Sequence, residues 1–153
     1  MTVYLLALLI GAVAGLRTMT APAMVSWAAH LGWLDLSGTW LAFLGNVWAR
    51  GILTLLVFIE LVTDQLPSTP SRTVPVQFGA RIISGALSGA AIGVSGGSIL
   101  GGLLAGIAGA IFGTLAGHSF RAKLATTFGS DRPAAFIEDA LAISAALVIG
   151  FAL

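Results

Sequence analysis

The chain has 153 residues, of which 58% are hydrophobic and only 8% are charged, and its mean hydropathy is +1.02. Seven Lys and Arg residues stand against six Asp and Glu residues, so the formal net charge is +1. This composition lies far outside the range of soluble domains and offers no basic surface for nucleic acid. The absence of cysteine excludes disulfides, thiolate zinc sites and thiol catalysis. We therefore expect a single integral membrane domain over residues 1–153.

Apolar segments long enough to cross a bilayer follow one another along the chain. A hydrocarbon core about 30 Å thick needs roughly 20 mostly apolar residues per helix. The first segment, Val3–Ala28, lacks the basic start of a cleaved signal peptide and is interpreted as the first span. Four more spans are expected at Trp40–Leu61, Gln77–Val94, Ile99–His118 and Ala134–Leu153. The sequence thus predicts an all-α, polytopic membrane helix bundle of about five glycine-rich spans.

The first span contains a polar interruption. Arg17 and Thr18 lie midway along it, close to Gly15, Thr20 and Pro22. An Arg at mid-bilayer costs at least about 2.5 kcal/mol, so Arg17 should face the bundle interior or a wet cavity and be paired. Breaks in membrane helices expose backbone polar groups, and transporters bind substrate at such breaks. We expect a break near Gly15–Pro22; the alternative is that Arg17 only neutralises an acid and fixes the packing.

The second span carries charges at its middle and at its end. Arg50 lies midway and, like Arg17, is expected to face the interior and be paired. Glu60 and Asp64 close the span in the sequence IELVTDQLP and, four residues apart, share one helix face. The whole chain has only six acidic residues. This pair is therefore a candidate for coordinating or relaying a cation.

The third and fourth spans are rich in glycine. Two series recur at intervals of four residues: Gly85, Gly89, Gly93, Gly97 and Gly101, and then Gly109, Gly113 and Gly117. Residues four apart share a helix face, and small residues allow close packing of helices in lipid. The stripes are therefore predicted to be helix–helix seams; the alternative is that they form thin walls beside a substrate path. The short SGGS connection indicates a tightly packed or re-entrant pair.

The fifth span begins with the acidic pair Glu138 and Asp139, which would join Glu60 and Asp64 at one membrane face. Supporting charges are expected on that face at Arg72, Arg81, His118, Arg121 and Lys123. Because basic residues mark cytoplasmic loops, we assign both basic loops and the N-terminus to the cytoplasmic side of the cell (inner) membrane. The alternative is a salt-bridged collar in contact with water, where charges cost little.

Five segments resemble one family of bacterial membrane proteins. They are AGLRTMTAPA in the first span, IELVTDQLPSTPSR after the second, ARIISGALSGA in the third, GHSFRAKLATTFG after the fourth and FIEDALAIS in the fifth. Together they are similar to the uncharacterised family catalogued as domain of unknown function 4126. The most specific features are the spacing of Glu60, Asp64 and Pro67 and the acidic pair of the fifth span. Family members usually have Lys after the Asp, where this chain has Gln65. The resemblance implies an architecture and no established activity.

The candidate path for an ion or solute comprises Arg17, Thr18, Arg50, Glu60, Asp64, Glu138 and Asp139. The sequence favours a small transporter or channel-like protein for a cation or small polar solute in the lipid bilayer. The alternative is a non-catalytic membrane scaffold whose charged cytoplasmic face binds lipid headgroups or a partner protein.

Enzymatic functions have weak support in the sequence. His30 and His118 are its only histidines, and no nucleophile or phosphate-binding motif is present. We expect no catalytic residues and no cofactor. A lipid-modifying enzyme that uses Glu60, Asp64 and a metal is the remaining enzymatic alternative. Metal binding and the oligomeric state stay open, a homo-oligomer included.

Overall fold

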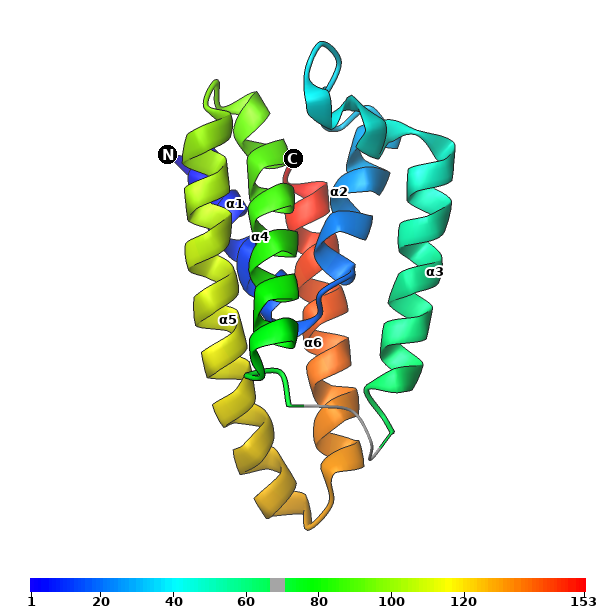
Figure 1. Cartoon of the computed structure of the whole chain (residues 1–153), viewed down its shortest axis with the longest axis vertical. Helices are drawn as coiled ribbons and strands as arrows, with labels where there is room; N and C mark the ends of the chain where they lie inside the picture. Colours follow the sequence, from blue (N-terminus) through cyan, green and yellow to red (C-terminus); the bar gives the residue numbers. More distant parts are fainter. Residues whose placement is uncertain (67–70) are drawn as a thin grey trace.

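The computed structural model describes residues 1–66 and 71–153, and in this part of the chain all regular structure is helical. The described helices are α1 (Thr2–Leu16), α2 (Thr20–His30), the 3-10 helix η1 (Trp40–Gly45), α3 (Val47–Thr63), α4 (Pro75–Ser95), α5 (Ile99–Phe128) and α6 (Asp131–Phe151). They stand side by side as one bundle (Figure 1). The predicted all-α class is confirmed. Pro67, which belongs to the family-like motif, lies outside the described residues.

Three helices in the described part of the chain, α4, α5 and α6, are long and apolar enough to cross a membrane. The apolar helix α1 has only 15 residues and α2 has 11. At 1.5 Å per residue these two extend about 22 Å and about 16 Å, less than a hydrocarbon core about 30 Å thick. Helix α3, with 17 residues, runs beside the long helices (Figure 1). The chain is therefore a small multi-pass membrane protein.

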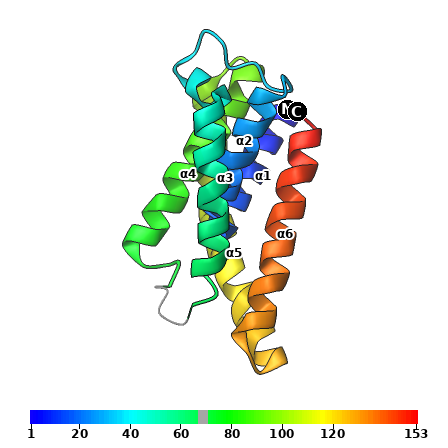
Figure 2. The same ribbon diagram turned by 90° about the vertical axis from the view of Figure 1, so that its right-hand side faces the viewer.

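The first predicted span is broken where expected, but it does not cross the bundle. α1 ends at Leu16, Arg17 is extended, and α2 begins at Thr20. α1 runs parallel to α5, with Tyr4 against Gly101 near one end. α2 then turns back and runs antiparallel to α3 (Figures 1 and 2). The predicted span Val3–Ala28 is thus a re-entrant pair of half-helices that begins and ends on one side.

Both termini lie at the end of the bundle opposite the basic loops. Val3 lies against Gly96 in the connection between α4 and α5, and Trp33 packs on Phe151 with ring centroids 5.2 Å apart. Figures 1 and 2 both show the two termini at this end of the bundle. The prediction that the N-terminus shares a side with the basic loops is therefore wrong. The physical reason is that α1 and α2 return to their starting side.

A glycine seam joins α4 to α5. A Cβ at Gly89 would overlap the carbonyl oxygen of Gly102, and a Cβ at Gly106 would overlap that of Gly85. The two backbones therefore touch where side chains would otherwise stand, which is the predicted role of these glycines. Gly97 does not belong to the seam. It lies in the turn after α4 with φ +75°, a conformation that favours glycine, so the predicted single stripe ends there.

Helix α1 packs on α5 in the same way, and Gly106 of α5 is shared between the two seams, because it also lies against Gly11 of α1. A Cβ at Gly109 would overlap the carbonyl oxygen of Leu8, and a Cβ at Gly113 would overlap that of Ala12. Because α1 touches the longest helix by backbone, its C-terminal end has a fixed position inside the bundle. That end forms one half of the candidate site.

Helix α3 stands at the edge of the bundle (Figure 1). Within residues 47–63, all of which the structure describes, no residue is buried. Trp27 of α2 donates to Thr54 Oγ1 at 3.0 Å, and the Arg50 guanidinium stacks 4.7 Å from the centre of a Trp27 ring. Arg50 therefore lies in the first turn of α3, near the termini. Its predicted position in the middle of a span is wrong, because η1 and Asn46 delay the start of α3.

Candidate functional site

The candidate site is built on residues 17–19, where the two half-helices meet inside the bundle. The last carbonyl groups of α1 and the first N–H groups of α2 have no partners within their own helices and carry opposite partial charges. Arg81 of α4 donates from Nη1 to the carbonyl oxygens of Gly15, at 3.0 Å, and Leu16, at 2.8 Å. Arg81 is only 3% exposed. A buried cation therefore caps the negative end of α1.

An anion caps the other half-helix. Glu60 of α3 accepts hydrogen bonds from the backbone N–H groups of Thr18, at 2.7 Å, and Met19, at 2.9 Å. These groups lie at the positive N-terminal end of α2, where a carboxylate is favoured. The turn is thus held between a base on α4 and an acid on α3.

Arg17 occupies the centre of the turn and is completely buried. One of its terminal nitrogens binds the carboxylate of Asp64 at the end of α3, and the other binds Asp139 of α6. Gln65 donates from Nε2 to Oδ2 of Asp139 at 3.2 Å. The predicted pairing of Arg17 is therefore present, and it ties the turn to two further helices.

A second set of ion pairs lies between the turn and the basic-loop end. Arg72, just before α4, binds both carboxylate oxygens of Glu138, with Nη2 at 2.7 Å from Oε2. Arg121 of α5 lies 3.5 Å from Glu138 and donates from Nε to Asp131 at 2.9 Å. Glu138 is 1% exposed, whereas the Asp131 side chain is 60% exposed. The charges therefore lead from the buried turn to the surface.

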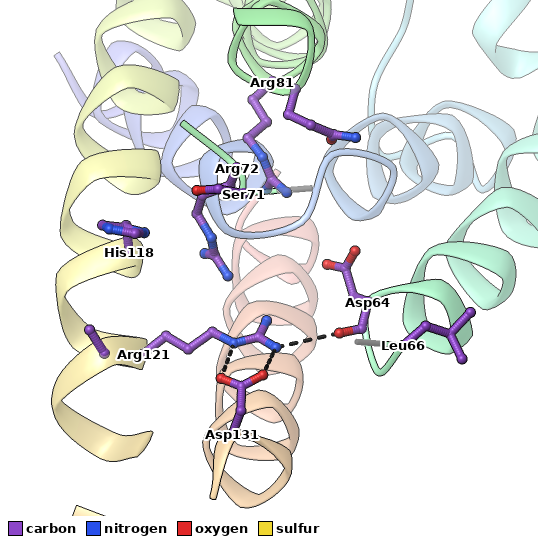
Figure 3. Close-up of a pocket in the computed structure, with 10 residues that line it drawn as sticks. Asp64, Leu66, Ser71, Arg72, Arg81, His118, Arg121 and Asp131 are labelled. Carbon is purple, nitrogen blue, oxygen red and sulfur yellow. Dashed lines mark hydrogen bonds and ion pairs between the residues drawn. The ribbon is translucent and has the colours of Figure 1, made fainter. Parts of the chain in front are cut away.

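Two cavities adjoin these charges. The first, about 350 Å³, is lined by Asp64, Arg72, Arg81, His118, Arg121 and Asp131, among others. Figure 3 shows Asp64, Arg72, Arg81 and Arg121 converging on this space from different segments. The second, about 460 Å³, lies between α3, α4 and the turn and is lined by Thr18, Glu60, Asp64 and apolar side chains. Asp64, Leu66 and Gln77 line both cavities, so the two lie next to each other.

A family model, described as Domain of unknown function (DUF4126), matches residues 4–152. The chain belongs to this family. The resemblance expected from the five sequence segments is thereby confirmed, and the match includes every residue of the charged site. No curated protein and no solved structure matches this DUF4126 chain.

The structure brings most of the predicted path of this DUF4126 protein together. Arg17, Thr18, Glu60, Asp64, Glu138 and Asp139 meet at or beside the turn. Among the predicted supporting charges, Arg72, Arg81 and Arg121 join them, and exposed His118 lines the first cavity. Lys123 is exposed on α5, and Arg50 lies at the opposite end of the bundle. Among the ion pairs of the described residues, the Arg121–Asp131 pair is the one that reaches solvent, as the collar alternative expects.

Sequence reasoning missed several polar groups at the turn. Ser84 Oγ donates to the Thr18 carbonyl, and Thr114 Oγ1 lies 3.3 Å from the Gly15 carbonyl oxygen. Single hydroxyls within glycine-rich helices give no periodic signal, so these contacts were not foreseeable. The Arg121–Asp131 pair could have been predicted, because only residues 129 and 130 separate α5, which carries Arg121, from α6, which begins at Asp131.

The sixth acid of the DUF4126 chain, Asp35, lies apart from the site in the loop between α2 and η1. Ser37 donates to it from Oγ at 2.6 Å and from its backbone N–H at 2.9 Å. These hydrogen bonds hold the pKa of the Asp35 carboxyl below its ordinary value. Asp35 is therefore a suitable control position for changes to the buried acids.

Proposed function

We propose that this protein is a small, non-enzymatic transporter or channel-like protein that moves an ion or a small polar solute past the charged turn. The observation that carries the proposal is the meeting of two half-helices, inside the bundle, beside two cavities lined by charge. Non-helical backbone at membrane depth is tolerated only where it is buried in protein or lines a cavity. In secondary transporters such junctions hold the substrate or the coupling ion.

The depth of the turn supports this function. α1 brings the chain about 22 Å from the end where the termini lie, at 1.5 Å per residue. Asp139 is the ninth residue of α6, about 12 Å from the other end of that helix. The Arg17–Asp139 pair is therefore in the interior of the bundle. Intramembrane charges are expensive, and they commonly mark ion or substrate pathways.

The cavities supply space for a small polar ligand. Their volumes, about 350 Å³ and about 460 Å³, fall in the usual range for ligand pockets. The first carries three guanidinium groups and two carboxylates, so it suits a charged or strongly polar solute. Asp64 lines both cavities and Glu60 lines the second, so these carboxylates are the candidates for contact with a solute.

A second candidate function, a membrane scaffold, is favoured by the pairing of Arg17. Both terminal nitrogens of this fully buried side chain are already bound by carboxylates, so the turn needs no ligand to complete it. In that case the cluster would only fix the shape of the bundle. Exposed Lys123 and Arg132 at the basic end would then contact lipid headgroups or a partner protein.

Flux measurements in proteoliposomes separate the two functions. We expect the wild type to pass protons or another ion from a broad panel faster than empty liposomes do. Asp64→Asn and Glu60→Gln should reduce this flux while the melting curves of the same preparations stay close to wild type. Asp35→Asn is the matched control, because it removes an exposed carboxylate far from the turn, and it should leave the flux unchanged.

Two outcomes would change the assignment. Flux that survives both substitutions would remove these carboxylates from the mechanism. No flux from the folded wild type with any ion of the panel would favour the scaffold.

A further inference from the structure

The enclosed charges of the site balance in number but are segregated in space. The half around the turn, here called the acidic half, contains three acids and one base: Glu60, Asp64, Asp139 and Arg17. The half along the first cavity, the basic half, contains three bases and one acid: Arg72, Arg81, Arg121 and Glu138. None of these residues is exposed. Three minus one leaves two negative charges in the acidic half and two positive charges in the basic half, so the whole is neutral.

This neutral total determines what charge a ligand can bring. Asp131 is left out of the count, because its side chain is 60% exposed and its charge is solvated. A net charge carried into an enclosed, balanced site stays uncompensated and costs free energy. A zwitterion, which has one acidic and one ammonium group, adds no net charge. Its dipole can also lie along the separation between the two halves, with the acidic group towards the bases.

The basic half has an open position at Arg81. Nη1 of Arg81 donates to two carbonyl groups of α1, and none of the ion pairs of the described residues includes this side chain. Its Nε atom is buried and has no hydrogen-bond partner in the described structure. Arg72, by contrast, already binds both carboxylate oxygens of Glu138. Arg81 is therefore an enclosed cation that lines a cavity without an anionic partner, and an acidic group in that cavity would supply one.

The acidic half has an open position at Asp64, which lines the same cavity. Its Oδ2 atom binds Arg17, whereas no described residue donates a hydrogen bond to its Oδ1 atom. Arg17 is also shared with Asp139, so Asp64 has only part of one base. Figure 3 shows the side chains of Arg81 and Asp64 directed into the same space. An ammonium group in this space could donate to Oδ1 of Asp64.

The first cavity limits the size and the kind of zwitterion. Its volume, about 350 Å³, is near the lower end of the usual range of roughly 300–1,000 Å³ for ligand pockets, so the ligand is small. Quaternary ammonium groups are recognised by aromatic rings, and the described lining contains no Phe, Tyr or Trp, so an ammonium group with N–H donors fits better. A guanidinium group binds carboxylate and phosphate with the same geometry, so either can be the acidic group.

We propose that the first cavity binds a small zwitterion, with its carboxylate or phosphate group on Arg81 and its ammonium group on Asp64, and that this zwitterion is the polar solute that the protein moves. The second part of the proposal rests on the proposed transport function, and the binding site does not. Free amino acids and the ethanolamine phosphodiester headgroup of a lipid share this chemistry, so the experiment separates the two sources.

Thermal unfolding in dodecyl maltoside micelles, which carry no zwitterionic headgroup, measures binding, because a ligand of the native state raises the melting temperature. The zwitterionic probes are L-alanine, β-alanine and glycerophosphoethanolamine. Propionate, dimethyl phosphate and ethylamine are the matched fragments with a single charge. We expect at least one zwitterion to bind, and to bind at least tenfold more tightly than each of its fragments. No binding of any zwitterion, or equal binding of a fragment, would overturn the site.

Substitutions test the acid-binding end. Arg81→Gln should weaken binding of the zwitterion at least tenfold, because it removes charge-assisted hydrogen bonds, whereas Lys123→Gln, at an exposed base outside the cavity lining, should not. Should Arg81→Gln fail to fold, exposed Ser71, which also lines the cavity, decides the question. Ser71→Glu places a carboxylate beside the basic half and should bind the zwitterion at least tenfold more weakly than Ser71→Gln, which is of the same size. Equal binding by these two variants, or unchanged binding by folded Arg81→Gln, would overturn the site.

Adding phospholipid to the micelles identifies the source of the zwitterion. Phosphatidylethanolamine should raise the melting temperature of the wild type more than that of Arg81→Gln if the headgroup is the ligand, and it should have no such effect if the ligand is a free solute. Phosphatidylglycerol is the control, because its headgroup has the phosphate without the ammonium group. Equal stabilisation by the two lipids through Arg81 would mean a site for anions and would overturn the zwitterion.

Binding and transport fail independently. If the wild type binds a probe while neither the labelled probe nor any ion passes into proteoliposomes, the site stands and its role in transport is overturned. Ion flux through a protein that binds no zwitterion would overturn the site and leave transport standing.

Discussion

Replacing Arg17 by Gln removes the only base between Asp64 and Asp139 while keeping a polar side chain of similar reach. Arg17 is completely buried, and both acids are largely enclosed, with 12% of each side chain exposed. Removing one partner of a buried ion pair costs about 3–5 kcal/mol, because the other partner is left as an uncompensated charge. We expect Arg17→Gln to lower the free energy of unfolding by this amount.

Equilibrium unfolding in mixed detergent micelles measures this change in the free energy of unfolding. The control is Arg132→Gln, which replaces an exposed base at the start of α6 and should leave the free energy of unfolding within about 0.5 kcal/mol of the wild-type value. Adding Asp139→Asn to Arg17→Gln removes one of the two abandoned acids. The double variant should therefore be more stable than the sum of the two single effects, with a coupling of about 0.5–3 kcal/mol. A loss below about 1 kcal/mol for Arg17→Gln is the value typical of a solvated pair, and it would refute a buried junction.

Three further predictions concern the rest of the bundle. Gly106→Ala should separate α4 from α5 and lower the free energy of unfolding by about 1–3 kcal/mol in the same assay. Gly79→Ala is the control, because a Cβ there meets no atom within 4 Å and should leave the stability unchanged. Equal stability of the two variants would contradict the seam. A thiol reagent that does not cross the membrane should label Ser37→Cys but not Ser130→Cys in intact cells, because the basic loops are expected to be cytoplasmic. The reverse result would place the basic loops outside the cell. Arg50→Gln should leave ion flux unchanged and cost only about 0.5–1 kcal/mol, the value of an exposed cation–π contact; a loss of flux would return Arg50 to the path.

The break in the first helix was predictable, but its direction was not. Gly15, Arg17 and Pro22 mark a place where a membrane helix can stop. Whether the chain then continues or turns back depends on what caps the two open helix ends. Those groups, Glu60 and Arg81, come from α3 and α4, far along the sequence. Hydropathy over Val3–Ala28 gives a sufficient length and carries no information on reversal.

The sequence predicts where the charged residues gather, but it does not predict which acid pairs with which base. The spacing of Glu60 and Asp64 puts both on one helix face, and the acidic pair of α6 was expected at the same membrane face. The partner of Asp139 was not, because Arg17 lies 122 residues earlier in the chain.

The error at Arg50 has a local cause that the sequence does contain. Asn46 accepts a hydrogen bond from the backbone N–H of Trp48 at 3.0 Å and so caps the start of α3. Asn is among the residues most favoured at this position. Recognising it would have moved the beginning of the second span from Trp40 to Val47 and placed Arg50 at its end.

The re-entrant pair of half-helices also sets the order in which the protein assembles during synthesis. Residues 2–30 leave the ribosome before the helices that hold them, yet neither half-helix is long enough to be anchored as a spanning segment. Glu60, which caps α2, is made with α3, and Arg81, which caps α1, is made with α4. The glycines that pack against α1 are made with α5, and Asp139, the second partner of Arg17, is made with α6. Residues 2–30 therefore complete their native contacts only after α6 has been made.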